Sequence, residues 1–186
     1  LTKVNGTEKR AYNPEDKRKM GENGKKYPGW SWNRPENWFD FESAHNHYQN
    51  LEESCGLAFI LQKESDPYND TPDPFLFIDI DNCITPRDDG DELYADVDEI
   101  IERLGGTYSE VSTSGTGLHF LYKGQLPPGI ERAAFDIGGD ASVEIYDGKR
   151  VCVMTGVTHE YFEHLRKSPI KEVNAEALSD LLDQFG

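Results

Sequence analysis

Two aspartates close one of the most hydrophobic segments of the chain. The segment FLFIDID covers residues 75–81, and its carboxylates belong to Asp79 and Asp81. Side chains of a β-strand alternate between its two faces, so both carboxylates are expected on one face, with Cα atoms roughly 7 Å apart. Uncompensated charges on a buried strand are costly, which favours a positive group between them. Carboxylates at this spacing can bind one or two divalent cations, Mg²⁺ or Mn²⁺, and two-metal sites promote phosphoryl transfer.

A glycine-containing turn forms the second group of candidate residues. The segment STSGTGLHF covers residues 112–120 and joins two segments that read as strands. Glycines let the backbone approach a ligand and present successive N–H groups, as in an anion-binding nest. A hydroxyl precedes the turn, and a histidine follows it within reach of the same phosphate. An ordinary hairpin with a half-buried histidine is the alternative interpretation. The candidate phosphate-binding residues are Ser114, Gly115, Thr116, Gly117 and His119.

The segment VEIYDGKR, residues 143–150, supplies a third carboxylate. Glu144 stands in an otherwise core-like strand, and it could complete a site with Asp79 and Asp81. Arg150 follows the Asp-Gly turn and could meet a phosphate. A hairpin with alternating faces and a basic turn is common, so this segment alone does not require a site. Three carboxylates, a phosphate nest and a histidine, all at strand ends, are together hard to explain by packing.

The elements that must position these residues follow from hydrophobic periodicity and turn signals. The expected order is a helix, two strands, a helix, a strand pair, a connection, a hairpin turning at Asp147–Gly148, and two C-terminal helices. This pattern indicates an α+β sheet resembling the core of an RNA-recognition motif (RRM). The segments in that order are 40–51, 56–62, 75–81, 94–104 with Gly105–Gly106 as its C-cap, 107–114 with 118–124, 125–140, 142–156, 158–167 and 174–185.

Composition narrows the possible partners. The chain of 186 residues carries a net charge of −16, which argues against broad adhesion to nucleic acid. Residues 1–30 are an exception, with eight Lys or Arg against four Asp or Glu, and are expected to form a basic arm or irregular segment. No apolar run is long enough to cross a membrane. The cysteine pattern indicates a reducing compartment, so a cytoplasmic protein is expected. The three cysteines, Cys55, Cys83 and Cys152, are expected to be reduced core residues.

The three motifs, taken in order, resemble those of a known enzyme family. FLFIDID, SGTGLH and VEIYD with a following Arg and Thr-Gly resemble the catalytic motifs of the archaeo-eukaryotic primase (AEP) superfamily. The similarity is greatest to the prim-pol (primase-polymerase) domains of phage, archaeal-virus and plasmid replication proteins. KRAYNP and NWFDFESA, upstream, resemble N-terminal segments of these proteins. The resemblance implies an RRM-like catalytic subdomain with a mixed or antiparallel sheet, plus an N-terminal α/β subdomain. It divides the chain into an arm (1–30), a prim-pol catalytic domain (31–160) and C-terminal helices (161–186) that pack on the domain or leave it.

The resemblance also implies a function, template-directed nucleotidyl transfer by a DNA primase or DNA polymerase. Asp79, Asp81 and Glu144 would hold two divalent cations, Mg²⁺ or Mn²⁺. His119 and the SGTG turn would hold the triphosphate of the incoming nucleotide, assisted by Arg150. The implied partners are a single-stranded DNA template, a dNTP or NTP, and a helicase domain in the full-length protein or in trans. Nothing in the chain resembles a P-loop, and the oligomeric state is open.

Two other classes of function compete with this interpretation. Haloacid-dehalogenase-type phosphatases begin with an apolar strand that ends in D-x-D-G-T, which FIDIDNCI resembles. Here Asn82 and Cys83 stand where Gly and Thr are expected, and GGDAS at 138–142 lacks the second Asp of the later phosphatase motif. The other competitor is a non-catalytic RRM-like module that binds nucleic acid. Such a module needs basic and aromatic residues on its sheet face, where this chain places carboxylates.

Overall fold

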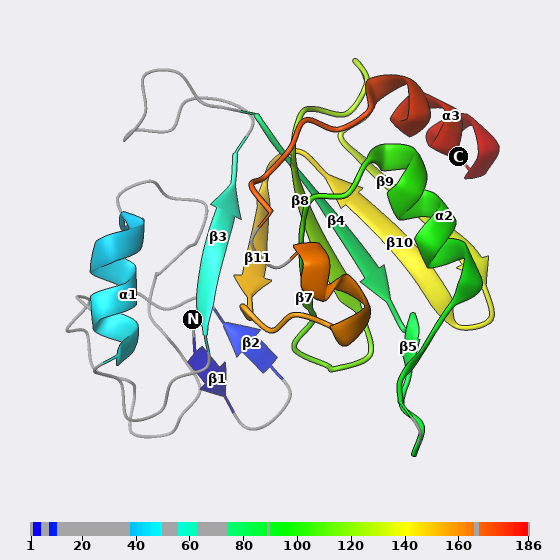
Figure 1. Ribbon diagram of the computed structural model, residues 1–186. Helices are drawn as coiled ribbons and strands as arrows, with labels where there is room; N and C mark the ends of the chain where they lie inside the picture. The colour runs from blue at the N-terminus through cyan, green and yellow to red at the C-terminus, as the bar shows by residue number, and fades with distance from the viewer. Residues whose placement is uncertain are drawn as a thin grey trace.

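A five-stranded antiparallel sheet forms the centre of the protein (Figure 1). The computed structural model describes residues 2–4, 8–10, 38–49, 56–62, 74–88, 90–165 and 168–185. The strand order is β7-β8-β4-β10-β9, so the FLFIDID strand lies in the middle. The α+β class expected from the sequence is confirmed. The five strands are β4 (Phe75–Asp81), β7 (Tyr108–Val111), β8 (Leu118–Lys123), β9 (Arg132–Gly138) and β10 (Ala141–Tyr146).

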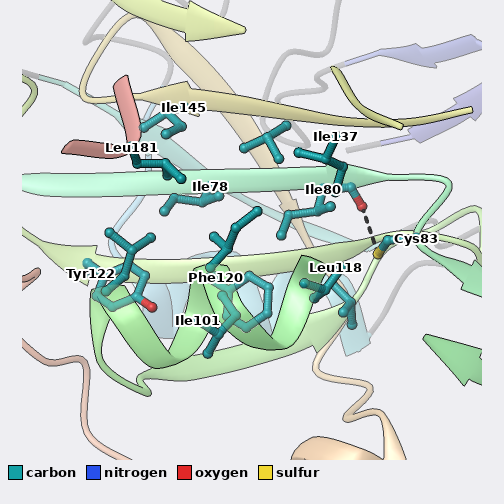
Figure 2. Packing of buried hydrophobic residues seen from close by; sticks show 14 of the residues in the cluster. Ile78, Ile80, Cys83, Ile101, Leu118, Phe120, Tyr122, Ile137, Ile145 and Leu181 are labelled. Atoms are coloured by element: carbon teal, nitrogen blue, oxygen red, sulfur yellow. Dashed lines mark hydrogen bonds between the residues drawn. The ribbon is translucent and has the colours of Figure 1, made fainter. Parts of the chain in front are cut away.

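Two helices, α2 (Ala95–Leu104) and α3 (Ala175–Phe185), cover one face of this sheet (Figure 1). The apolar residues of α2 recur at helical spacing, so they form a stripe that can pack on the sheet. From β4, the alternate residues Leu76, Ile78 and Ile80 point into this core, where Figure 2 shows Ile78 and Ile80 beside Phe120 and Leu118 of β8. Burying each such side chain contributes about 1.5–3 kcal/mol. The helix residues in the core are Val97, Ile100, Ile101, Leu104, Leu178, Leu181 and Leu182.

A two-stranded antiparallel sheet, β3 (Leu57–Leu61) with β11 (Arg150–Met154), covers part of the opposite face. Phe77 of β4, Leu121 of β8 and Tyr146 of β10 pack there against Leu61 and Cys152 in a second, smaller hydrophobic cluster. The front half of β4 is therefore covered on both faces. This explains why a strand that ends in two aspartates begins with apolar residues on both faces.

The remaining described elements are short. Helix α1 begins after Asp40, whose carboxylate accepts the Ser43 N–H at 2.8 Å and so caps the helix. Two described segments of the predicted basic arm pair as antiparallel strands, and the rest of that arm lies outside the described residues. Among the described helices, none is long and apolar enough to span a membrane. These elements are α1 (Phe41–Gln49), β1 (Thr2–Val4), β2 (Glu8–Arg10), β5 (Ile84–Thr85), β6 (Glu92–Leu93) and the 3₁₀ helix η2 (Glu160–Leu165).

The prediction that 125–140 is a connection is wrong for its second half. Arg132–Gly138 forms β9, the edge strand that pairs with β10. Phe135 and Ile137 are buried in the main core, whereas Arg132 and Asp136 on the alternate positions are exposed. This alternation is the signature of a half-buried strand, and the prolines and glycine at the start of the segment concealed it.

The prediction of a hairpin over 142–156 is also wrong. β10 pairs with β4 and β9, so both of its edges are taken, and β11 pairs with β3 in the other sheet. The turn between them leads the chain out of the main sheet. Asp147 is buried and its carboxylate accepts the N–H of Leu126 at 3.1 Å, and Lys149 adopts a φ of +54°. The helix expected over 158–167 is a 3₁₀ helix whose regular geometry breaks at Phe162.

Two of the three cysteines are buried free thiols, as the sequence predicts, and Cys55 lies outside the described residues. Burial raises the pKa of Cys83 to about 12, and it raises the pKa of Cys152 as well. Because the thiolate is the reactive form, neither should be alkylated in a brief exposure of the native protein to iodoacetamide. Peptide mass spectrometry checks this, with urea-unfolded protein as the control in which both react. Rapid native labelling of either one would contradict the burial described here.

Candidate active site

Four polar side chains lie in one row across the main sheet. Glu110 of β7 is paired with His119 of β8, His119 with Asp79 of β4, and Asp79 with Glu144 of β10. Residues directly opposite each other on antiparallel strands point to the same face, with Cβ atoms about 4.5–5.5 Å apart. The row lies on the face that carries β3 and β11, just beyond the smaller hydrophobic cluster. The sheet therefore brings Asp79, Glu144 and His119 together, as the sequence motifs predict.

Asp81 lies on the same face, two residues further along β4. It is exposed and is paired with Ser142 of β10, which in turn is paired with Asp136 of β9. The register of β4 and β10 thus places the three predicted carboxylates on one face of the sheet. In the described ranges, no group of three acidic, histidine or cysteine side chains is arranged to hold a metal ion. The three carboxylates therefore share a face without meeting at one point. Like charges on one face repel one another.

Asp79 is a largely buried carboxylate with an unsatisfied oxygen atom. Its side chain is only 17% exposed, and its Oδ1 atom is buried without a hydrogen-bond partner. Burial raises the pKa of Asp79, and although His119 and Arg150 act in the opposite direction, Asp81 and Glu144 raise it further, so that the pKa is above its ordinary value. Divalent Mg²⁺ and Mn²⁺ prefer carboxylate oxygens. The orphaned oxygen and the three carboxylates on one face therefore fit such a cation.

A stability difference follows from this charge. Replacing Asp79 with Asn should raise the thermal unfolding midpoint of the metal-free protein at neutral pH, by on the order of 2 °C. Because the folded-state pKa is raised, the ionised carboxylate destabilises the fold above that pKa, and the penalty disappears as the pH falls below the ordinary value. Circular dichroism melts at neutral and acidic pH would measure the difference, which should shrink on acidification. The exposed Asp136→Asn is the control, and an Asp79→Asn variant less stable than wild type at neutral pH would contradict the expectation.

His119 is held between two carboxylates. Its Nδ1 atom lies 2.9 Å from Glu110 Oε1, and its Nε2 atom lies 3.6 Å from Asp79 Oδ1. Its ring also packs on Phe77, with ring centroids 5.1 Å apart. The ring is 6% exposed, so its position is set by these neighbours. The nitrogen that remains for a ligand is Nε2, on the side of Asp79.

Glu110 is a buried residue of the site that the sequence interpretation missed. It is 1% exposed. Burial alone would raise its pKa, but hydrogen bonds from His119, from the Gly156 and Thr155 N–H groups and from Tyr108 together lower the pKa of Glu110. A signal was available in the sequence. If the SGTG turn pairs the strands on either side, Glu110 falls opposite His119, which is the register observed.

The turn over 112–117 lies against the end of β4. A Cβ atom added to Gly117 would stand 2.8 Å from the Ile80 carbonyl oxygen, so only glycine allows this approach. The Ile84 N–H also donates to the Thr116 carbonyl at 3.0 Å. The hydroxyls of Ser112, Ser114 and Thr116 form a chain within the turn. Gly115 has a φ of +81°, and Ser114 and Gly115 are exposed. The predicted phosphate-binding turn is thereby placed next to Asp81.

Arg150, the first residue of β11, reaches the carboxylate row from the second sheet. Its Nη2 atom lies 3.3 Å from Glu144 Oε2, and its guanidinium lies over the Tyr146 ring, 4.3 Å from the centroid. Tyr146 donates its hydroxyl to the same Glu144 oxygen, and burial together with this hydrogen bond raises the pKa of Tyr146 to about 12. Glu144 is therefore engaged by two donors, one of which is a cation.

The fold and these residues define an α+β protein with a row of carboxylates, a histidine and a glycine turn on one sheet face. No protein-family model matches the chain. It is 30% identical over 129 residues to a protein named DNA primase-polymerase from Nitratiruptor phage NrS-1. The alignment covers 69% of this chain but 16% of that relative, so the chain spans only a small part of the phage protein. The similarity supports the prim-pol relationship suggested by the three motifs.

Proposed function

We propose that this chain is a prim-pol domain of the AEP superfamily, which catalyses metal-dependent, template-directed nucleotidyl transfer during replication of a virus or other mobile element. The observation that carries the proposal is the unpartnered, buried Oδ1 of Asp79, on the same sheet face as Asp81 and Glu144. The similarity to the phage DNA primase-polymerase covers most of the chain and gives independent support.

The three carboxylates are the proposed ligands of the cations. Two Mg²⁺ or Mn²⁺ ions bound to Asp79, Asp81 and Glu144 would lower the pKa of a 3′-hydroxyl and neutralise developing charge on the phosphates. Asp79 would gain the partner that its Oδ1 lacks. Glu144 would bind a cation in place of Arg150. The Arg150 guanidinium would then be free to contact a phosphate.

The residues around the row would hold the incoming nucleotide. The turn from Ser114 to Gly117 lies next to Asp81, and its Ser114 hydroxyl is on an exposed residue. The N–H groups of Gly115 and Thr116 are bonded inside the turn. The Nε2 atom of His119 lies beside Asp79. A triphosphate bound by both would bring its α-phosphate toward the carboxylates. Preorganised donors of this kind stabilise charge without having to reorganise during the reaction.

The two competing functions have less support. For the phosphatase, Cys83 stands at the position of the motif's threonine, and its thiol points into the hydrophobic core, where it donates to the Ile80 carbonyl (Figure 2). For a non-catalytic RRM-like binder, Phe75 and Phe77 would be the stacking platform for bases. The second sheet covers both of them, so that role is not open to them.

The proposed partners are a single-stranded DNA template and a dNTP or NTP. A helicase domain, in the full-length protein or in trans, is a further proposed partner, as the resemblance to prim-pol replication proteins implies. The expected location is the cytoplasm, the host's if the protein is viral or plasmid-encoded.

A labelled-primer assay on a single-stranded template tests the proposal. Wild-type chain and Asp79→Ala/Asp81→Ala would be compared with dNTPs or NTPs in Mg²⁺ or Mn²⁺, with a primer-free reaction alongside. We expect a metal-dependent product that the double variant does not form, and the primer-free reaction separates primase from polymerase. Hydrolysis of a generic phosphoester by a folded wild type that makes no such product would instead support the phosphatase.

A further inference from the structure

We propose that Glu110 is the residue that positions His119 for nucleotide binding. The inference rests on the proposed function and deepens it. Glu110 itself lies outside the three motifs, but it contacts His119 of the second motif and the Thr155–Gly156 pair that follows the third. It approaches the site from β7, on the side of His119 away from Asp79.

The surroundings of Glu110 commit both of its carboxylate oxygens. Oε1 accepts the Thr155 N–H at 3.0 Å and lies 2.9 Å from His119 Nδ1. Oε2 accepts the Gly156 N–H at 3.0 Å and the Tyr108 hydroxyl at 2.7 Å. Because each oxygen already faces a backbone N–H group, which can only donate, the carboxylate acts as the acceptor and Nδ1 of His119 as the donor.

This arrangement fixes a hydrogen on Nδ1 and the direction of the imidazole. With the hydrogen on Nδ1 held by Glu110, the ring cannot flip without losing that bond and leaving a buried carboxylate oxygen short of a partner. The packing of His119 on Phe77 opposes the same flip. Nε2 then lies on the side of Asp79, where the nucleotide phosphates are proposed to lie. It donates to a phosphate oxygen when the ring carries a hydrogen on both nitrogens.

Glu110 also connects His119 to the second sheet. Thr155 and Gly156 follow β11 directly, and the Thr155 hydroxyl donates to the Val111 carbonyl at 2.6 Å. The other end of β11 carries Arg150, which contacts Glu144. Strand β11 and the two residues after it therefore contact both ends of the polar row. They contact Glu144 at one end and Glu110 at the other. A histidine fixed by a carboxylate in this way is a recurrent device for orienting a ligand-binding ring, and loss of such a partner commonly costs about 10–100-fold in affinity at metal sites.

Glu110→Gln and Tyr108→Phe are a matched pair of variants. Glutamine keeps the shape but removes the charge and turns an NH₂ group toward the donors on one side of the residue. The charge-assisted hydrogen bond that the carboxylate accepts from His119 is therefore lost. Tyr108→Phe removes a donor to the same carboxylate and leaves the contact with His119. The first readout is the nitrogen-15 NMR spectrum of the His119 ring in the nucleotide-free protein. The second is the Kd of a non-hydrolysable deoxyadenosine triphosphate analogue in Mg²⁺, measured for each single variant, for His119→Ala and for the double variant Glu110→Gln/His119→Ala.

We expect wild type and Tyr108→Phe to show a solvent-protected Nδ1–H on His119, and Glu110→Gln to lose it. The Kd should rise at least about tenfold in Glu110→Gln. The double variant should bind no more weakly than His119→Ala, because the two residues act as a unit.

A Glu110→Gln variant with a wild-type ring spectrum and wild-type Kd would overturn the inference, as would additive losses of affinity in the double variant. If Glu110→Gln folds poorly, the wild-type spectrum decides, since absence of the protected Nδ1–H overturns the inference. A wild type with the expected spectrum that binds no nucleotide would instead refute the proposed function and leave the Glu110–His119 contact standing.

Discussion

Replacing Asp79 with Asn is expected to lower the rate of nucleotide incorporation by about 10³-fold or more, because several kcal/mol of transition-state stabilisation depend on the cations that this carboxylate would hold. Asn keeps the size of the side chain and removes its charge. The loss should appear in kcat more than in KM for the nucleotide, because the turn and His119 remain in place. Single-turnover primer extension with excess enzyme measures it.

Asp136→Asn is the matched control for this prediction. Asp136 is an exposed carboxylate on the same sheet face, separated from Asp81 by one strand, and is outside the row that contains Asp79. Its replacement removes the same charge and should leave the rate close to wild type. Equal losses of rate in the two variants would show that the activity depends on the total negative charge of this face and not on a defined site.

Gly117→Ala is expected to weaken nucleotide binding at least about tenfold and to destabilise the protein by about 1–3 kcal/mol. The added Cβ would stand 2.8 Å from the Ile80 carbonyl oxygen and 3.0 Å from Ser112 Oγ. A backbone atom cannot give way without moving the end of β4 or the start of β8. Either movement displaces the turn from Asp81, so affinity and stability should fall together. Nucleotide titration and urea unfolding of the same preparation measure both.

Gly106→Ala tests whether any crowded glycine has this effect. A Cβ there would meet Leu165 Cδ2 at 3.1 Å, which is the end of a side chain that can rotate away. We expect a smaller loss of stability and an unchanged nucleotide affinity. An equally weak nucleotide affinity in Gly106→Ala, or wild-type affinity in Gly117→Ala, would mean that the turn is not the phosphate-binding element.

The local part of the site could be predicted from the sequence because it depends on periodicity alone. Alternation along β4 places Asp79 and Asp81 on one face, and the glycine turn specifies the pairing of its two flanking strands. Glu144 follows the same alternation in β10. The sequence also predicts that these carboxylates have cationic or hydrogen-bond-donating neighbours, because buried carboxylates require such partners.

The long-range part of the site could not be predicted in this way. Glu110 receives its backbone donors from Thr155 and Gly156, which are 45 and 46 residues away in the chain. The SGTG turn predicts that Glu110 lies opposite His119, but it does not predict that Glu110 is buried or which N–H groups it binds. The hairpin expected over 142–156 failed for a related reason, because the partners of β10 and β11 are decided by which sheet each strand completes and not by the Asp-Gly turn between them.

Binding of Mn²⁺ would show whether Asp79, Asp81 and Glu144 form a divalent-cation site. Free Mn²⁺ would be followed by electron paramagnetic resonance during titration into wild type, Asp79→Asn and Asp136→Asn, without nucleotide. We expect a Mn²⁺ site in wild type that persists in Asp136→Asn and is lost in Asp79→Asn. Indistinguishable Mn²⁺ binding by wild type and Asp79→Asn would contradict it.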